Sequence, residues 1–278
     1  MNKRTLLKAG IGVAVLGSYA HFIEPRWQRV KKVKVTLPNL HPTFNKYRIA
    51  QISDIHADDH MTRGLLLGAV TRILKRKPDM VVITGDLMTR RVITDFEALR
   101  IALSRLQAPD GVYFVPGNHD YWEDGLLDQL RAMLASIGIV DLSNRVQTIT
   151  REGKLGTGQL HIAGVDDVVF RQARLDVVLD ELPDDGAAIL LCHEPDFADV
   201  VAPYNRFDLQ LSGHTHGGQI RLPFYGTVYG PKHGIRYSAG MYEVDTLKLY
   251  VNVGLGTVTL PIRFNCRPEI TLFTLRSP

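Results

Sequence analysis

The chain has 278 residues, of which 45% are hydrophobic and 22% charged, enough for a core in one large domain or two small ones. Its formal net charge of +4 is unevenly distributed. Residues 1–34 contain eight cations and one acid, a charge of +7, which leaves −3 on residues 35–278. General binding of nucleic acid requires a basic surface on the folded body. Because this body is mildly acidic, we expect no general nucleic-acid binding.

Residues 1–25 have the arrangement of a signal peptide or a membrane-anchor segment. Three cations precede an uncharged stretch, residues 9–20, and the small residues Ser18 and Ala20 suit cleavage by a signal peptidase. That stretch is too short to span a bilayer, which takes ~20 residues. Residues 2–8 resemble a twin-arginine export signal in which Lys3 replaces the first arginine.

A basic lead-in follows and leaves the cellular location open. Its cations are Arg26, Arg29, Lys31, Lys32 and Lys34. Such a cluster could contact anionic lipid headgroups and tends to stay on the cytoplasmic side of a membrane. The signal-like segment favours export to the periplasm or cell envelope instead. We expect contact with a membrane surface through the N-terminus and favour export. The alternatives are the cytoplasmic face of the inner membrane and the cytosol.

In the body, residues 46–278, predicted strands and helices alternate at first. Val33, Val35 and Leu37 alternate with polar residues, which predicts a half-exposed first strand within the lead-in of residues 26–45. Buried strands are predicted at residues 48–53, 80–84 and 111–115, and helices at residues 62–77, 94–106 and 124–137. Successive strand–helix units predict a parallel, right-handed β-α-β-α-β half.

The second half is richer in strands and has no linker-like composition. Strands are predicted at residues 145–150, 159–164, 187–192, 207–211, 235–244, 246–253 and 269–275. We expect them to form a second sheet that packs on the first, with helices outside. The predicted architecture is a single α/β domain, a four-layer α/β/β/α sandwich of two mixed β-sheets.

Side chains that suit metal ions lie at the ends of five predicted strands. The segments are Asp54-Ile55-His56, Gly85-Asp86, Gly117-Asn118-His119-Asp120, Cys192-His193 and Gly213-His214-Thr215-His216. Carboxylate, amide and imidazole groups suit Mn, Fe or Zn. Open α/β sheets collect ligands outside the carboxyl ends of their strands. Each segment alone is a weak signal, but together they predict a site for two metal ions.

The two cysteines are too few for a disulfide framework. Cys192 follows the apolar run of residues 187–191 and is predicted to be a buried structural thiol. A disulfide between Cys192 and Cys266 remains open at this point.

The five segments resemble the pattern of the calcineurin-like binuclear metallophosphoesterase family, which reads Asp-x-His, Gly-Asp, Gly-Asn-His-(Asp/Glu), His and Gly-His-x-His. Gly254, Gly256, Pro261 and Arg263 resemble a bacterial branch of membrane-associated or exported phosphodiesterases. That branch includes proteins with twin-arginine signals and UDP-2,3-diacylglucosamine pyrophosphatase-like proteins. The resemblance implies a metallo-dependent phosphatase-like fold. It also implies hydrolysis of a phosphodiester or pyrophosphate, with a lipid-linked or nucleotide-sugar-lipid substrate such as UDP-2,3-diacylglucosamine as one candidate.

The resemblance further implies a role for each motif residue. One metal ion would be bound by Asp54, His56 and His216, the other by Asn118, His193 and His214, with Asp86 bridging both. Manganese is the expected metal, with Fe or Zn as alternatives. His119 would protonate the leaving oxygen or stabilise developing charge, and Asp120 would orient the ring of His119.

Other polar and aromatic residues are weaker candidates. Asp58, Asp59 and His60 are expected in a solvated loop rather than in a third metal site. The remaining candidates are His161, Asp166 and Asp167 for substrate contact, Tyr121 and Trp122 for a substrate entrance or simple packing, and Gly217 and Gly218 for a tight turn.

Two alternative functions stay open. A phosphomonoesterase or phosphoprotein phosphatase would use the same metals but usually needs extra cationic groups for a dianionic substrate. A metal-holding scaffold without catalysis would need neither the complete ligand set nor the pair His119 and Asp120.

Overall fold

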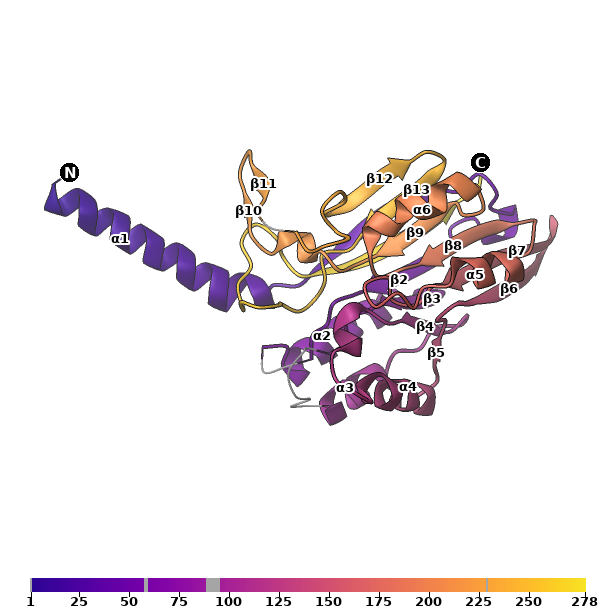
Figure 1. Ribbon diagram of the computed structural model, residues 1–278, viewed down its shortest axis with the longest axis horizontal. Helices are drawn as coiled ribbons and strands as arrows, with labels where there is room; N and C mark the ends of the chain where they lie inside the picture. Colours follow the sequence, from indigo (N-terminus) through magenta and orange to yellow (C-terminus); the bar gives the residue numbers. More distant parts are fainter. Residues whose placement is uncertain (1, 58–59, 89–95, 229) are drawn as a thin grey trace.

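The computed structural model describes residues 2–57, 60–88, 96–228 and 230–278. Two six-stranded sheets lie face to face in this described part (Figure 1). Helices α2 (Arg63–Leu74), α3 (Phe96–Leu103) and α4 (Leu126–Ser136) pack on the outer face of the first sheet. Helices α5 (Leu175–Glu181) and α6 (Ala198–Val201) pack on the outer face of the second. The predicted four-layer α/β/β/α sandwich is confirmed.

The first sheet contains the predicted parallel half. Its strand order is β1 (Arg29–Thr36), β14 (Glu269–Arg276), β2 (Arg48–Ile52), β3 (Met80–Thr84), β4 (Val112–Val115) and β5 (Ile139–Asp141). The pairs β2–β3, β3–β4 and β4–β5 are all parallel, and α2, α3 and α4 connect them. The short strand β5 was not predicted.

One strand lies in a different sheet from the one expected. The segment at residues 269–275 was predicted to join the second sheet, but β14 pairs with β2 and β1 in the first sheet. A strand that is buried on both faces has the same apolar pattern in either sheet, so the sequence pattern does not specify its partners.

The second sheet has the order β12 (Gly240–Val244), β13 (Leu247–Val251), β9 (Leu209–Ser212), β8 (Ala187–Leu191), β7 (Gly156–Gly164) and β6 (Arg145–Gly153). Strand β12 begins later than the predicted residue 235. The backbone N–H groups of Ile235 and Tyr237 donate to the Asp196 carboxylate instead of to a neighbouring strand. A separate two-stranded hairpin, β10 (Arg221–Leu222) and β11 (Gly226–Thr227), was not predicted.

The alternation of side chains along β3 explains why the sheets stack. Val81 and Ile83 face the helices, whereas Met80 and Val82 face the second sheet. All five residues of this strand are buried, which is why its sequence is apolar without alternating polarity. Burying an aliphatic or aromatic side chain fully contributes roughly 1.5–3 kcal/mol. The apolar core between the two sheets therefore holds them in a defined position relative to each other.

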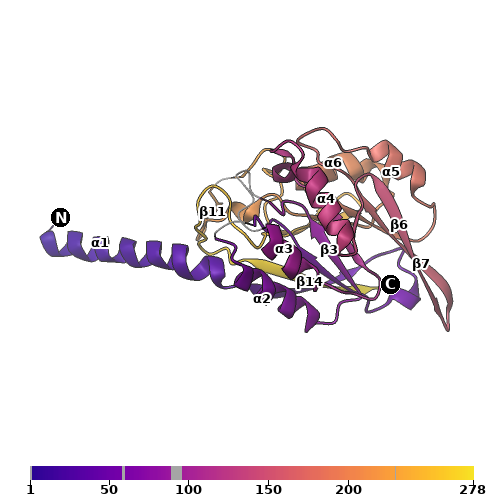
Figure 2. The ribbon, with the colours of Figure 1, turned by 90° about the horizontal axis from the view of Figure 1, so that it is seen from below.

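The N-terminal helix α1 (Lys3–Ser18) projects from the body in both views (Figures 1 and 2). The Asn2 side chain caps it by accepting from the N–H groups of Arg4 and Thr5. The chain becomes part of the body at Ala20, whose carbonyl accepts from the Arg263 N–H. Glu24 is 1% exposed and accepts from the Cys266 N–H. Ala20 and Glu24 therefore already contact the body.

Among the described helices, none combines the length and the apolar character that crossing a bilayer demands. Cys192 and Cys266 are both buried and both free, so the structure has no disulfide between them. The prediction that Cys192 is a buried thiol is confirmed.

Candidate metal centre

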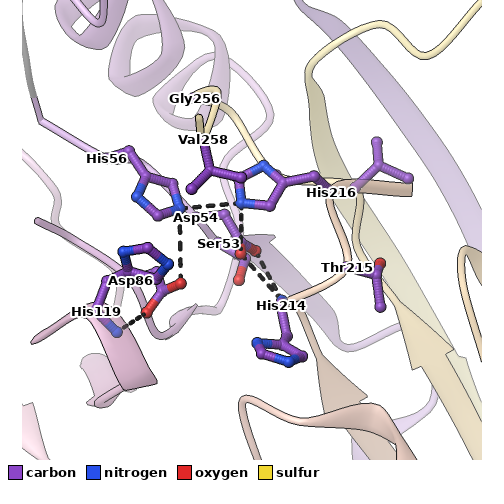
Figure 3. A network of polar contacts seen from close by, with 12 residues as sticks. Ser53, Asp54, His56, Asp86, His119, His214, Thr215, His216, Gly256 and Val258 are labelled. Atoms are coloured by element: carbon purple, nitrogen blue, oxygen red, sulfur yellow. Dashed lines mark hydrogen bonds and ion pairs between the residues drawn. The ribbon is translucent and has the colours of Figure 1, made fainter. Parts of the chain in front are cut away.

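The candidate ligands all follow strand ends, and both sheets supply them. Asp54 and His56 come after β2, Asp86 after β3 and Asn118 after β4, in the first sheet. His193 follows β8, and His214 and His216 follow β9, in the second. The carboxyl ends of these strands meet at one edge of the sandwich, where the side chains approach one another (Figure 3).

Two groups of potential ligand atoms form at this edge within the described residues. Asp54, His56, Asp86 and His216 make the first group, and Asp86, His193 and His214 the second. Within each group the ligand atoms lie within 4.8 Å of one another. Asp86 belongs to both groups, which places its carboxylate where it could contact two ions. The six carboxylate and imidazole side chains that the sequence pattern selected are thus brought together at one edge.

Backbone carbonyls set the protonation of two imidazoles. His193 Nδ1 lies 2.7 Å from the Thr84 carbonyl, and His214 Nε2 lies 2.7 Å from the Lys232 carbonyl. A carbonyl only accepts hydrogen bonds, so these nitrogens carry the hydrogen atoms. His193 Nε2 and His214 Nδ1 then keep free lone pairs. Metal-binding histidines are commonly oriented through their other ring nitrogen in this way.

The neighbourhood of His193 attracts positive charge. Its Nε2 has no hydrogen-bond partner and lies 3.2 Å from Asp86 Oδ2. Two lone pairs facing each other repel unless a cation lies between them. Burial opposes charge on His193, but the carboxylates of Asp86, Asp54 and Glu194 together raise the pKa of His193 well above its usual range. An imidazole nitrogen and a carboxylate oxygen this close together fit a divalent cation held between them.

His56 and His216 are prepared as neutral ligands. Their Nε2 atoms are 2.9 Å apart, and His216 Nε2 lies 3.3 Å from Asp54 Oδ1. Burial lowers the pKa of His56 to about 3 and lowers the pKa of His216 well below its usual value. The buried amide oxygen of Asn118 also has no hydrogen-bond partner. Buried polar atoms without partners are uncommon in folded proteins, so these groups fit a bound metal.

The backbone is strained at most of these ligands. Five of the seven have positive φ angles: Asp54 (49°), His56 (45°), Asp86 (53°), His214 (70°) and His216 (51°). Left-handed backbone at a residue other than glycine costs roughly 1–3 kcal/mol and concentrates at functional sites. The sharp turns direct several side chains from each loop toward one point.

Close approach of the two sheets requires glycine at position 213. The His214 N–H donates to both carboxylate oxygens of Asp54, at 3.0 and 3.1 Å. A Cβ atom on Gly213 would overlap Ser53 Oγ and Asp54 Oδ2. Any larger residue would push apart the loops that carry the first group of ligands.

His119 lies beside the two groups of ligands. It is part of a 3₁₀ turn, Asn118–Tyr121, and its backbone N–H donates to Asp86 Oδ1 at 2.9 Å. Its ring centroid is 4.8 Å from that of His56 and 3.8 Å from that of Trp122. The side chain is therefore placed to contact a group bound next to Asp86, with Trp122 against its ring.

Asp120 makes backbone contacts that the sequence pattern did not indicate. Its Oδ2 accepts from the N–H groups of Asp86 and Gly117, and its Oδ1 accepts from the Met88 N–H. All three bonds are 3.0–3.1 Å long, and the side chain is fully buried. Asp120 thus ties the loop after β3 to the loop after β4 and positions Asp86. The expectation that it orients the His119 ring stays a prediction.

The weaker candidates separate into distinct environments. Trp122 is 37% exposed beside His119, whereas the Tyr121 hydroxyl donates to Asp166 Oδ1 at 2.6 Å and is packed. His161 is fully buried, with its ring nitrogens 2.8 Å from Thr148 Oγ1 and the Asp185 carbonyl, so it is not available to substrate.

Asp58 and Asp59 lie outside the described residues. The expected tight turn is present, with positive φ at Gly217 and Gly218.

Sequence reasoning named Asp167 as a candidate for substrate contact but missed its buried partner, the carboxyl group of Glu194. Asp167 and Glu194 are both fully buried and interact with each other, and burial raises the pKa of each. An acid directly after the His193 motif was the available signal for Glu194. Nothing in the sequence could have singled out the carbonyls of Thr84 and Lys232, because every residue has a carbonyl group.

Comparison with known proteins places the whole chain among metallophosphoesterases. Residues 47–218 match the family model described as calcineurin-like phosphoesterase. The chain is 35% identical over 287 residues to the uncharacterized metallophosphoesterase YkuE of Bacillus subtilis, covering 100% of this chain and 98% of that protein. It is 28% identical over 280 residues to the phosphodiesterase YaeI of Escherichia coli, covering 99% of each. It is 30% identical over 283 residues to a Danio rerio transmembrane protein with a metallophosphoesterase domain, covering 98% of this chain and 63% of that protein.

Proposed function

Because the chain belongs to the calcineurin-like phosphoesterase family, we propose that it cleaves a phosphodiester or pyrophosphate bond with two divalent metal ions. Membership in this family makes it a hydrolase of phosphoester bonds, and one of its relatives is named a phosphodiesterase. The observation that carries the two-metal proposal is the presence of Asp86 in both groups of ligand atoms.

The side chains of the candidate metal centre fit two ions. Asp54, His56, Asp86 and His216 would hold one, and Asp86, Asn118, His193 and His214 the other. Ions held in this way supply Lewis acidity and make water a nucleophile near neutral pH. We propose manganese, with Fe or Zn as alternatives, because the donors are oxygen and imidazole nitrogen without thiolate.

His119 is proposed as the group that acts on the leaving oxygen. Its backbone is fixed by Asp86 and its ring by Trp122, so the imidazole is oriented before substrate binds. From there it could donate a proton to the departing oxygen or stabilise negative charge on the phosphoryl group. Asp120 contributes indirectly, by holding the loop that carries Asp86.

Between the two phosphate esters, a diester fits the charge of Arg263 better than a monoester. Arg263 is a fully buried cation whose charge acts on His56 and His216. Its guanidinium donates to the carbonyls of Val253, Gly256 and Cys266, so it is not free to bind a phosphate. A dianionic monoester usually calls for additional cationic groups, and Arg263 does not provide one, which supports a singly charged diester.

The substrate class is tested by comparing bis-p-nitrophenyl phosphate with p-nitrophenyl phosphate at saturating Mn²⁺. We expect a higher kcat/KM for the diester, and faster turnover of the monoester would contradict this preference. Loss of all activity in chelator-treated protein, and its return with Mn²⁺, is the matched control for metal dependence. Failure to hydrolyse either compound would favour a metal-holding scaffold.

We also propose a lipid-linked substrate such as UDP-2,3-diacylglucosamine and a location at a membrane surface. Helix α1 supports this: Val13 and Val15 are 71% and 62% exposed, and the same helix carries Arg4 and Lys8. Faster hydrolysis of UDP-2,3-diacylglucosamine than of bis-p-nitrophenyl phosphate would support the substrate. Protein from cells that begins at His21 would support export, and protein that begins at Met1 would favour the cytoplasmic face.

A further inference from the structure

An apolar surface extends from the hairpin of β10 and β11. We define the hairpin tip as Leu222, Phe224, Tyr225 and Val228. Phe224 is fully exposed and Tyr225 is 75% exposed. Large apolar side chains grouped on a surface mark contact with a membrane or another molecule, whereas scattered ones need no explanation. The hairpin tip is therefore a candidate contact surface.

The hairpin tip is joined to the N-terminal segment. The Arg221 N–H donates to the Phe264 carbonyl at 2.9 Å, and Gln219 Nε2 donates to the Leu260 carbonyl at 3.2 Å. Three residues after Leu260, the Arg263 N–H donates to the Ala20 carbonyl. Figures 1 and 2 show the hairpin and the base of α1 at the same end of the molecule.

This end of the molecule carries further apolar side chains. Phe22 is 61% exposed, Ile23 54%, Trp27 52% and Leu260 55%. They belong to the segment after α1 and to the loop that contacts the hairpin. The hairpin tip is thus one part of a wider surface that mixes aromatic and aliphatic groups.

The exposed charges of these segments have one sign. Residues 1–28, 217–242 and 254–268 contain one acid, Glu24, which is buried. They do contain cations, among them the exposed side chains of Arg4, Lys8 and Lys232. Exposed aromatic and aliphatic groups next to cations, with no exposed acid in these segments, suit an interface with anionic lipids. A second copy of this chain would instead bring like charges together.

We propose that the hairpin tip inserts into the headgroup region of an anionic phospholipid bilayer, as a contact separate from α1. The hairpin is also tied to the candidate metal centre: Arg221 Nη1 and Thr227 Oγ1 both donate to the Gly217 carbonyl, at 3.2 and 3.3 Å. Gly217 directly follows His216. Docking through the tip would therefore hold the metal centre close to the lipid surface. The proposal does not depend on the reaction that is catalysed.

The test measures partition of the full-length protein onto vesicles of phosphatidylglycerol and phosphatidylethanolamine, compared with phosphatidylcholine alone. We expect Phe224→Ser/Tyr225→Ser to weaken binding to the anionic vesicles by about tenfold or more, since insertion scales with buried apolar area. Leu155→Ser is the matched control, because Leu155 is 70% exposed in the turn between β6 and β7. These strands lie away from α1 in both views (Figures 1 and 2).

A second readout reports insertion directly. The fluorescence of Phe224→Trp should be quenched by brominated lipid, and that of Leu155→Trp should gain no comparable quenching. Equal partition of the wild type and the double variant, or absence of quenching at position 224, would overturn the proposal. So would a concentration-dependent dimer that the double variant abolishes without a change in vesicle binding. Hydrolysis of bis-p-nitrophenyl phosphate, which is soluble, should be unchanged in the double variant, so this result is independent of the proposed reaction.

Discussion

Replacing Asp86 by Asn is expected to lower kcat for bis-p-nitrophenyl phosphate by about 10³-fold or more. Asp86 is the one residue common to both groups of ligand atoms, and its Oδ1 also accepts from the His119 N–H. An amide keeps the shape of the side chain but removes the negative charge that would bind two cations. Metal ions supply several kcal/mol to reactions of this kind, and each 1.36 kcal/mol is about tenfold in rate.

The matched control is Asp128→Asn, which removes a carboxylate from the exposed surface of α4. That variant should keep full activity and full metal content. Metal analysis of Asp86→Asn should show fewer bound ions than the wild type. If Asp86→Asn retained both ions and wild-type turnover, Asp86 would not be the bridging ligand.

The second large effect is expected for His119→Ala, which should lower kcat by ~10²–10⁴-fold while both metal ions remain bound. The ring lies next to His56 but is not a member of either ligand group. If the imidazole protonates the leaving oxygen, the loss should depend on the leaving group. It should be smallest for p-nitrophenolate, which leaves readily without a proton, and larger for diesters of less acidic alcohols.

An equal loss for all leaving groups would assign His119 to charge stabilisation rather than proton transfer. Unchanged turnover would remove it from the mechanism altogether. His41→Ala is a suitable control, because the His41 ring bonds to Thr43 in a turn outside the ligand groups. It should retain both activity and metal content.

Strand ends were the part of the site that could be predicted from the sequence. The run from Met80 to Thr84 predicted a strand buried on both faces, and Asp86 follows it directly. The same reasoning placed His193 after β8 and His214 after β9. Parallel strands bring their carboxyl ends to one edge, so residues that are far apart in the chain could be expected to meet.

Contacts made by backbone atoms could not be predicted in this way. The carbonyls of Thr84 and Lys232 set the free nitrogens of His193 and His214, but every residue offers a carbonyl. The backbone contacts of Asp120 could not be predicted for a related reason. Its partners are three backbone N–H groups, whose positions depend on how the loops after β3 and β4 pack.

The sequence pattern also could not predict which sheet each strand joins. Strand β14 has the apolar character of any buried strand, and only its pairing with β2 and β1 assigns it to the first sheet. The hairpin of β10 and β11 has two residues in each strand, too few to produce a periodic pattern. Its exposed aromatic residues become informative once their neighbours in space are known.

The most direct measurement of the two-metal site is an anomalous difference map from crystals of the Mn²⁺-loaded protein. Two peaks are predicted, ~3.5–4 Å apart and on either side of the Asp86 carboxylate. One peak should contact Asp54, His56 and His216, and the other Asn118, His193 and His214. A single peak, or manganese bound away from Asp86, would contradict the account.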